Sequence, residues 1–170
     1  MKKGARDLEI KQDLVFQRRE WAVQRIGWWI LTAFVVAALL GLFGGGPLSS
    51  ARAGHPDAPL RVDYERFVRV GAPTRLTLRG NLTGLTPGSG LRLRIRRDYF
   101  EAFRVEKIAP EPASIAIGDE EVDLHFGADA VGSGLFTIIF EIEPVEAGLQ
   151  GAGFRANDAA GVTFRQLTYF

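Results

Sequence analysis

The chain lacks cysteine altogether and has only two histidines among its 170 residues. Without cysteine it can form no disulfide framework, thiolate nucleophile, iron–sulfur cluster or sulfur-based zinc site. The two histidines, His55 and His125, stand far apart and outside any HExxH motif, which argues against a histidine zinc site as well. We therefore expect no metal and no cofactor, and a stability that comes from the hydrophobic core alone.

The sequence also lacks a recognisable catalytic pattern. Ser89 and Ser133 each lie between two glycines, but neither has the GxSxG spacing of a nucleophile elbow. His125 lies two residues from Asp123, yet a general base needs a nucleophile beside it, and the sequence offers none at a suitable spacing. The pattern predicts a protein that is not an enzyme.

Charge is missing from one long segment. Residues 26–43 (IGWWILTAFVVAALLGLF) carry no charged side chain and would span about 27 Å as a helix, close to the thickness of a bilayer core. We expect a transmembrane helix here, ended by residues 44–47 (GGGP). One alternative is a secretory signal cleaved after Ala53, although the 25 residues before the apolar run include four acids, which is unusual for a signal. The other is a buried core helix.

The charges that flank this segment differ on its two sides. Residues 1–25 hold seven basic side chains, whereas the 15 residues after Phe43 hold only Arg52. The positive-inside rule then places the N-terminus in the cytoplasm and residues 60–170 outside, in the periplasm if the membrane is a bacterial inner membrane. Residues 1–25 resemble an amphipathic tail that touches membrane lipid, and their mixed charge argues against nucleic acid as a partner.

Small residues recur every fourth position along the apolar segment, at Ala33, Ala37, Gly41 and Gly45. Such a stripe lets a second membrane helix approach closely. It predicts helix packing against either a second copy of the chain or a multi-pass membrane protein, and the sequence leaves that choice open.

The remainder changes period from 3.6 to 2. Residues 44–59 are rich in Gly, Pro, Ser and Ala, which is typical of a flexible linker. Residues 60–170 then alternate between apolar and polar, as in 91–96 (LRLRIR), with turn residues at short intervals. This favours an all-β domain, an immunoglobulin-like antiparallel sandwich of about seven to nine strands, with a small barrel as the alternative. The expected strands are 60–70, 75–79, 91–96, 99–107, 114–117, 122–126, 136–143, 151–155 and 162–169.

Charge is unevenly distributed along this domain, since positions 52–107 hold twelve basic and six acidic residues, and positions 108–170 hold two basic and ten acidic. One reading is a single arginine-rich sheet face that binds an anionic lipid or glycan. Its members would be Arg75, Arg79, Arg92, Arg94 and Arg96. The other reading is that basic strands pair beside acidic ones. The cross-strand partners would then be Glu121, Asp123, Glu141 and Glu143.

The layout as a whole resembles a family of small uncharacterised bacterial single-pass membrane proteins. The resemblance lies in the RREW segment at 18–21 before the apolar run, the stretch from Tyr64 to Leu76, and the closing pattern from Glu143 to Tyr169. It implies a retained anchor, a periplasmic β-sandwich and a partner among small multi-pass membrane proteins. It implies no catalytic or binding residue.

Overall fold

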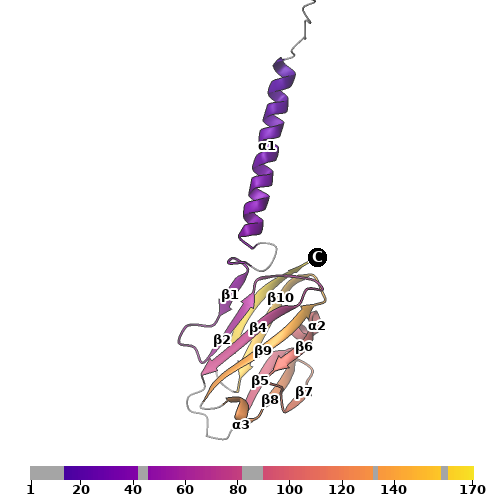
Figure 1. The fold of residues 1–170 in the computed structure, drawn as a ribbon. Coiled ribbons are helices and arrows are strands. Elements are labelled where there is room, and N and C mark those ends of the chain that lie inside the picture. The colour runs from indigo at the N-terminus through magenta and orange to yellow at the C-terminus, as the bar shows by residue number, and fades with distance from the viewer. Residues whose placement is uncertain (1–13, 42–45, 82–89, 132–133, 158–160) are drawn as a thin grey trace, which may run out of the picture. The chain divides into compact units, whose positions relative to one another are not determined.

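The structure, a computed structural model, describes residues 14–41, 46–81, 90–131, 134–157 and 161–170. The chain divides into two units, 1–37 and 38–170, which are described separately. The first holds most of helix α1 (Leu14–Leu39, Figure 1). The stretch Arg19–Leu39 is long and apolar enough to cross a membrane, because its 21 residues rise about 32 Å. None of this stretch is buried within the chain, which contradicts the core-helix alternative.

Helix α1 ends earlier than the sequence suggested. Gly41 has a φ of +84°, a left-handed conformation that glycine adopts without strain, and its N–H bonds the carbonyl of Ala38 at 3.0 Å. A side chain at Gly41 would collide with the backbone of Gly46. The helix therefore stops at Leu39, although apolar residues continue to Phe43.

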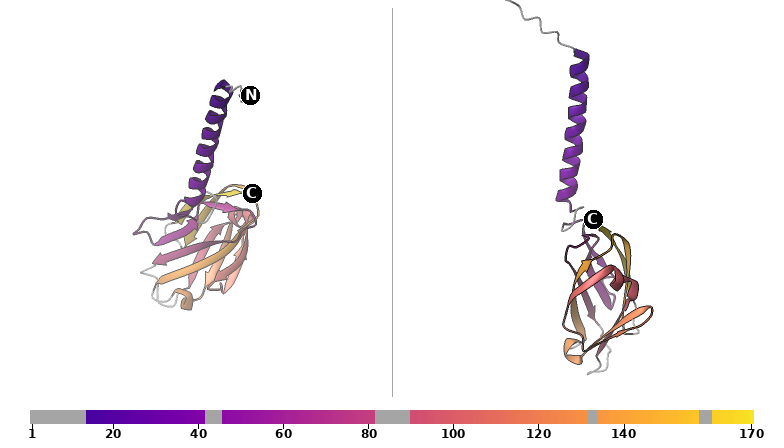
Figure 2. Two further views of the ribbon diagram at one scale, coloured as in Figure 1. Left: turned by 45° about the horizontal axis from the view of Figure 1, so that its top comes forward. Right: turned by 90° about the vertical axis from the view of Figure 1, so that its right-hand side faces the viewer.

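Over its described residues the second unit is a β-sandwich of eleven strands and two short helices (Figures 1 and 2). The strands are β1 (Ser50–Ala53), β2 (Leu60–Glu65), β3 (Phe67–Arg69), β4 (Thr74–Asn81), β5 (Leu91–Arg96), β6 (Phe103–Ala109), β7 (Ser114–Ile117), β8 (Glu121–Phe126), β9 (Leu135–Pro144), β10 (Gly148–Ala156) and β11 (Gly161–Tyr169). Helix α2 (Arg97–Ala102) lies between β5 and β6, and α3 (Ala128–Val131) lies between β8 and β9.

The strands form two sheets, one of five strands in the order β1-β2-β4-β9-β6 and one of six in the order β3-β11-β10-β5-β8-β7. All pairs are antiparallel except β3 with β11, which is parallel. Most connections carry the chain from one sheet to the other, so neighbours within a sheet are often distant in sequence. The predicted fold class, an all-β sandwich behind one N-terminal apolar helix, is confirmed.

Several details differ from the expectation. The described residues form eleven strands where seven to nine were expected, because β1 was not expected and the expected strand 60–70 forms two strands, β2 and β3. Strand β1 lies inside the range expected to be a linker, where it pairs with β2 over the whole of Ser50–Ala53. The expected strand 60–70 is interrupted at Arg66, and the first part of the expected strand 99–107 is helix α2. In α2 Tyr99 and Ala102 are buried three positions apart, which is helical spacing.

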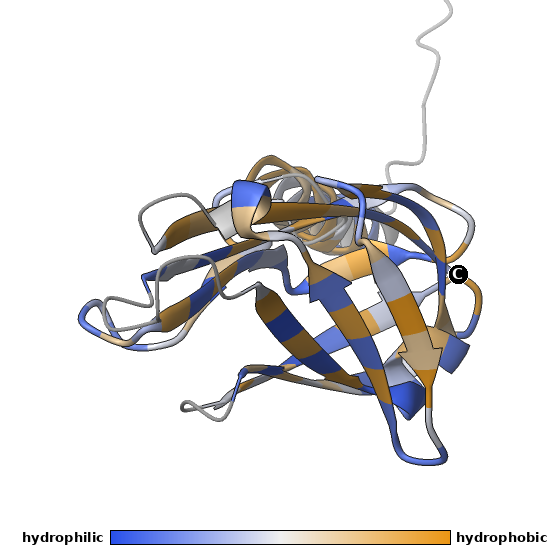
Figure 3. Cartoon of the chain, turned by 90° about the horizontal axis from the view of Figure 1, so that it is seen from below, coloured by the Kyte–Doolittle hydropathy of each residue, from blue (hydrophilic) through white to orange (hydrophobic). Residues whose placement is uncertain are grey.

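The core follows from the alternation along each strand, visible as alternating colours in Figure 3. On β4, Leu76 and Leu78 are almost fully buried, while Arg75, Thr77 and Arg79 on either side of them face out. The two sheets meet through aromatic rings such as Phe140 of β9 and Phe154 of β10, whose centroids are 6.1 Å apart. Each fully buried apolar side chain of this size contributes about 1.5–3 kcal/mol to the stability of the fold.

One polar chain crosses this apolar interior. The hydroxyl of Tyr99 donates to Oε1 of Gln166 at 2.7 Å, and Nε2 of Gln166 donates to the carbonyl of Glu65 at 2.8 Å. Burial raises the pKa of Tyr99 far above its usual value, so the hydroxyl stays protonated and remains a donor. The chain ties α2, β11 and the end of β2 together.

Removing the Tyr99 hydroxyl should destabilise the sandwich. In Tyr99→Phe the buried oxygen of Gln166 loses its donor, which costs about 1–3 kcal/mol. The control is Tyr64→Phe, which removes the same atom from a ring that packs on Phe164 but whose hydroxyl has no hydrogen bond among the described residues. Thermal unfolding of the full chain in detergent, followed by circular dichroism, checks this. Equal melting temperatures for the two variants would contradict it.

Candidate interaction surfaces

The five arginines of the expected anionic-ligand face do not share a face. Arg75 and Arg79 are on β4 of the five-stranded sheet, whereas Arg92, Arg94 and Arg96 are on β5 of the six-stranded sheet. On both strands the buried positions alternate with these arginines, so the two sets point to opposite outer faces of the sandwich. A single surface built from all five is therefore not what this fold provides.

Acidic side chains accompany most of these arginines. Arg75 pairs with Glu141 at 3.4 Å and Arg79 with Asp63 at 3.7 Å. Arg96 pairs with Asp98, and Arg94 donates to the carbonyl of Asn157 at 3.0 Å. The strand register also places Arg75 opposite Glu141, Arg94 opposite Asp123, Arg96 opposite Glu121 and Arg104 opposite Glu143, as the alternative reading of the charges predicted. The outward arginines of β4 and β5 are thus largely neutralised by neighbouring groups.

The strongest of these pairs joins Arg92 and Asp123. The Arg92 guanidinium donates through Nε at 3.2 Å and through Nη2 at 2.6 Å to the two carboxylate oxygens, a two-pronged geometry. These hydrogen bonds hold the pKa of Asp123 below its usual value, helped by the positive charge of Arg92 and Arg94, although partial burial opposes the shift. The carboxylate therefore pairs with Arg92 and not with the half-buried His125.

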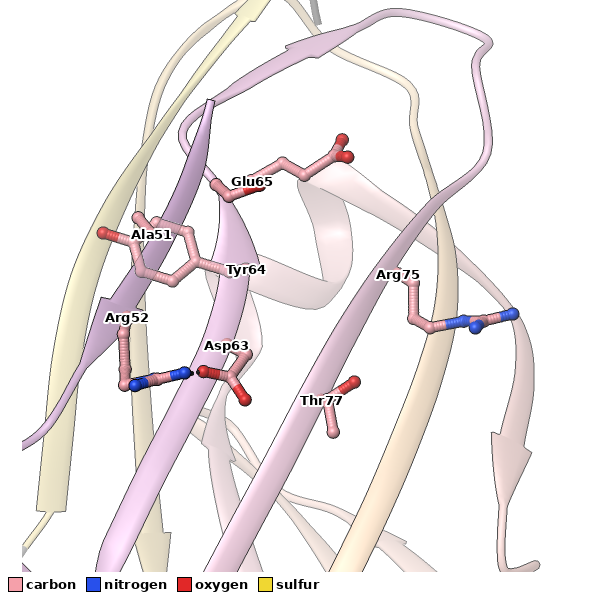
Figure 4. Close-up of a pocket in the computed structure, with 8 residues that line it drawn as sticks. Ala51, Arg52, Asp63, Tyr64, Glu65, Arg75 and Thr77 are labelled. Atoms are coloured by element: carbon pink, nitrogen blue, oxygen red, sulfur yellow. Dashed lines mark hydrogen bonds and ion pairs between the residues drawn. The ribbon is translucent and has the colours of Figure 1, made fainter. Parts of the chain in front are cut away.

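A hollow of about 460 Å³ opens on the outer face of the five-stranded sheet (Figure 4). Within it, Nε of Arg52 contacts Oδ1 of Asp63 at 2.6 Å, and the other oxygen of Asp63 faces Arg79. The charged groups at its floor pair with one another, so few of them are left to bind a polar ligand. The hollow is lined by Ser50, Ala51, Arg52, Asp63, Tyr64, Glu65, Arg75 and Thr77.

The residues considered for catalysis or helix packing are not brought together. His55 is exposed before β2, and His125 lies on β8. Across the described ranges no three His, Asp or Glu side chains could hold a metal ion, while Ser89 and Ser133 lie outside those ranges. Of the predicted helix stripe, Ala33 and Ala37 are on α1, Gly41 is in the turn beyond its end, and Gly45 lies outside the described residues.

The sequence did not predict a groove of about 530 Å³ between β6 and β7, the last strands of the two sheets on one side of the sandwich. Both walls and the connection between them contribute side chains. Its lining is mainly apolar, with two acids and one lysine: Val105, Glu106, Lys107, Ile108, Ala109, Pro110, Glu111, Pro112 and Ile115. We call this feature the β6–β7 groove.

Strand β7 beside the groove is exposed along its entire length. Its register places Ile115 opposite Leu124 and Ile117 opposite Val122, both of which are buried in the core. Ile115 and Ile117 thus point to the inner side of the sheet, yet they are 55% and 73% exposed. Alternation alone predicts core positions here, and only the sheet order reveals that β7 extends past the opposing sheet.

Comparisons with known proteins add little. The sequence matches no protein-family model and no curated protein. Among solved structures, a cohesin module from a Clostridium perfringens ATCC13124 family 33 glycoside hydrolase is similar at 12% identity with a TM-score of 0.47, over 66% of this chain and 96% of that one. A chain from a complex of CaDoc0917 with CaCohA2 is similar at 11% identity with a TM-score of 0.34, over 61% and 89%. These similarities are too distant to assign a function.

The Arg92–Asp123 pair should make stability depend on pH in the acid range. Because the pKa of Asp123 is lower in the folded state than in the unfolded state, its contribution is full above about pH 4 and is lost as the pH falls further. Asp123→Asn should lower the free energy of unfolding by about 0.5–1 kcal/mol at neutral pH. The decrease in that free energy on acidification should then be smaller by the same amount. Asp119→Asn, at an exposed turn residue, is the control. Melting curves from pH 7 to about pH 3 that are the same for both variants would contradict the prediction.

Proposed function

We propose that the chain is a membrane-anchored, non-catalytic interaction module whose sandwich binds another envelope protein. In this proposal α1 is a retained anchor with its N-terminus in the cytoplasm, and the sandwich lies in the periplasm of a bacterial cell. The length and composition of Arg19–Leu39 support the anchor, and the excess of basic residues before it supports the orientation. Ala33 and Ala37 remain the proposed packing face of the helix toward a membrane partner or a second copy.

The observation that carries the proposal is the uncovered inner face of β7. An edge strand presents unpaired N–H and C=O groups, and soluble proteins usually protect such edges with charge, proline or a covering element. Here two isoleucines stand exposed beside an apolar groove instead. A strand from a partner that pairs with β7 would extend the six-stranded sheet and cover both isoleucines.

The charge around the groove indicates what kind of strand would fit. Glu111 precedes β7, Asp119 and Glu120 lie in the turn from β7 to β8, and Glu121 is the first residue of β8. No lysine or arginine occurs from residue 108 to residue 154. A partner segment that alternates apolar and basic side chains would satisfy both the groove and its acidic border, since opposite charges across an interface favour encounter and register. A second copy of β7 would bring acidic turns together and is disfavoured.

A photo-crosslinking side chain placed at Ala116 of the full chain, in native membranes, tests this function. The expected result is one discrete crosslinked species larger than the chain alone, absent when the crosslinker is placed at Thr163 on the opposite half of the same sheet. Adding Ile115→Lys and Ile117→Lys should abolish the species because charge blocks strand pairing.

The control for these substitutions is Leu135→Lys on β9, an equally exposed apolar residue outside the groove. Surface changes of this kind alter folding stability by about 0.5 kcal/mol or less, so expression should not change. A crosslinked species of twice the chain mass would identify a second copy instead. A species that survives both lysines would contradict the assignment to β7.

A further inference from the structure

The sandwich has a second exposed apolar surface, on the side opposite the β6–β7 groove. The outer face of the six-stranded sheet ends there in a row across three strands, with Leu149 of β10 paired to Leu167 of β11 and Leu167 paired to Phe67 of β3. Leu149 is 61% and Leu167 42% exposed. Together with exposed Leu48 these three residues form what we call the tether patch.

Hydrogen bonds connect the patch to the chain that emerges from α1. The N–H of Leu48 donates to the carbonyl of Leu40 at 3.1 Å, and Leu40 is the first residue after α1. The N–H of Arg66 bonds the carbonyl of Ser49, and the buried Ser49 hydroxyl bonds the carbonyl of Phe67 at 3.2 Å. If α1 spans a bilayer, these bonds keep Leu48 and the neighbouring ends of β3 and β11 close to its surface.

The charges beside the patch are mainly positive. Arg66 and Arg69 flank Phe67, and Arg165 is two residues before Leu167 on the same face. The structure records no ion pair for these three arginines with any residue that it describes, in contrast to the paired arginines of β4 and β5. The exposed Glu146, in the turn before β10, is the opposing charge nearby. A surface of leucine and half-buried phenylalanine, bordered by arginines with no ion pair to a described residue, is suited to anionic lipid headgroups above an acyl boundary.

We propose that the tether patch rests on the surface of the bilayer that α1 spans, with its apolar side chains at the headgroup boundary and Arg66, Arg69 and Arg165 on anionic lipid phosphates. This docking rests on the proposed function only through the anchor, because without α1 in the bilayer nothing would hold the patch at a lipid surface. It also fixes the orientation of the sandwich relative to the bilayer. Strands β3 and β7 are the two ends of the six-stranded sheet, so a bilayer beside β3 leaves β7 facing away.

The acidic end of the sheet supports the same orientation. Asp119, Glu120 and Glu121 lie in and after the turn between β7 and β8, at the edge opposite β3. An anionic bilayer attracts the arginine side and repels this acidic side, so the two effects act in the same direction. The docked sandwich therefore offers the β6–β7 groove to a partner instead of burying it against lipid.

Environment-sensitive labels test the proposal, and the absence of cysteine makes every introduced cysteine a unique labelling site. The full chain carries Leu149→Cys, Ala116→Cys or Leu31→Cys, each labelled with NBD, in vesicles of phosphatidylcholine and phosphatidylglycerol at about three to one. Leu31 on α1 reports the anchor, Leu149 the tether patch and Ala116 the opposite edge. Spin-labelled lipids then quench any label that lies in the bilayer.

We expect strong quenching at Leu31, quenching at Leu149 by lipids labelled near the headgroup, and about tenfold less at Ala116. Arg66→Gln with Arg69→Gln should reduce quenching at Leu149 severalfold in these vesicles, because each arginine near anionic lipid favours docking about fivefold. Quenching at Leu31 without quenching at Leu149 would overturn the docking and leave the anchor intact. A blue-shifted but unquenched label at Leu149 would assign the patch to a second copy, which also overturns it. No quenching at Leu31 would overturn the anchor and the docking together.

Discussion

The rest of the structure depends on one constraint, which is that the inner faces of both sheets pack against each other to form a common core. Leucine, isoleucine and phenylalanine side chains from the two sheets fill that space, and the polar chain within it, from Tyr99 to Glu65, is satisfied internally. The outward arginines of β4 and β5, in turn, are mostly paired with acids on neighbouring elements. What remains available for recognition is the two open sides of the sandwich, where each sheet comes to an end.

These two sides differ in chemistry, and the difference gives the module its proposed polarity. On one side β1 and β3 are joined by hydrogen bonds to the chain leaving α1, and exposed leucines, a half-buried phenylalanine and arginines with no ion pair to any described residue lie together. On the other side β6 and β7 border an apolar groove with acids around it. The first side is suited to contact anionic lipid, and the second is suited to bind a strand with basic side chains. In this account the anchor does more than retain the domain, because it determines which side meets the bilayer and which side meets a partner.

The sequence predicted the helix, the sandwich and most strands because each is a local pattern: a run without charge, or an alternation of apolar and polar residues. It placed the end of α1 too late because hydropathy does not register the backbone turn at Gly41. It grouped Arg75 with Arg92 because both follow the same alternation, whereas sheet membership depends on pairing over long distances. Both surfaces proposed here were missed for that reason. Ile117 has the pattern of a core residue, and Leu149 meets Leu167 and Phe67 only through the register of three strands.

The central claim is that the side bearing β3 faces the bilayer while β7 faces away from it. Three strand spacings, from β10 through β5 and β8 to β7, and several residues along the strands separate Leu149 from Ala116, on the order of 20 Å. Energy transfer from a dye at either position to acceptor lipids measures the distance of each from the surface of an anionic bilayer that holds the full chain. The account predicts that Ala116 lies farther from the acceptors than Leu149 by about that amount. Equal distances, or a shorter one for Ala116, would contradict it.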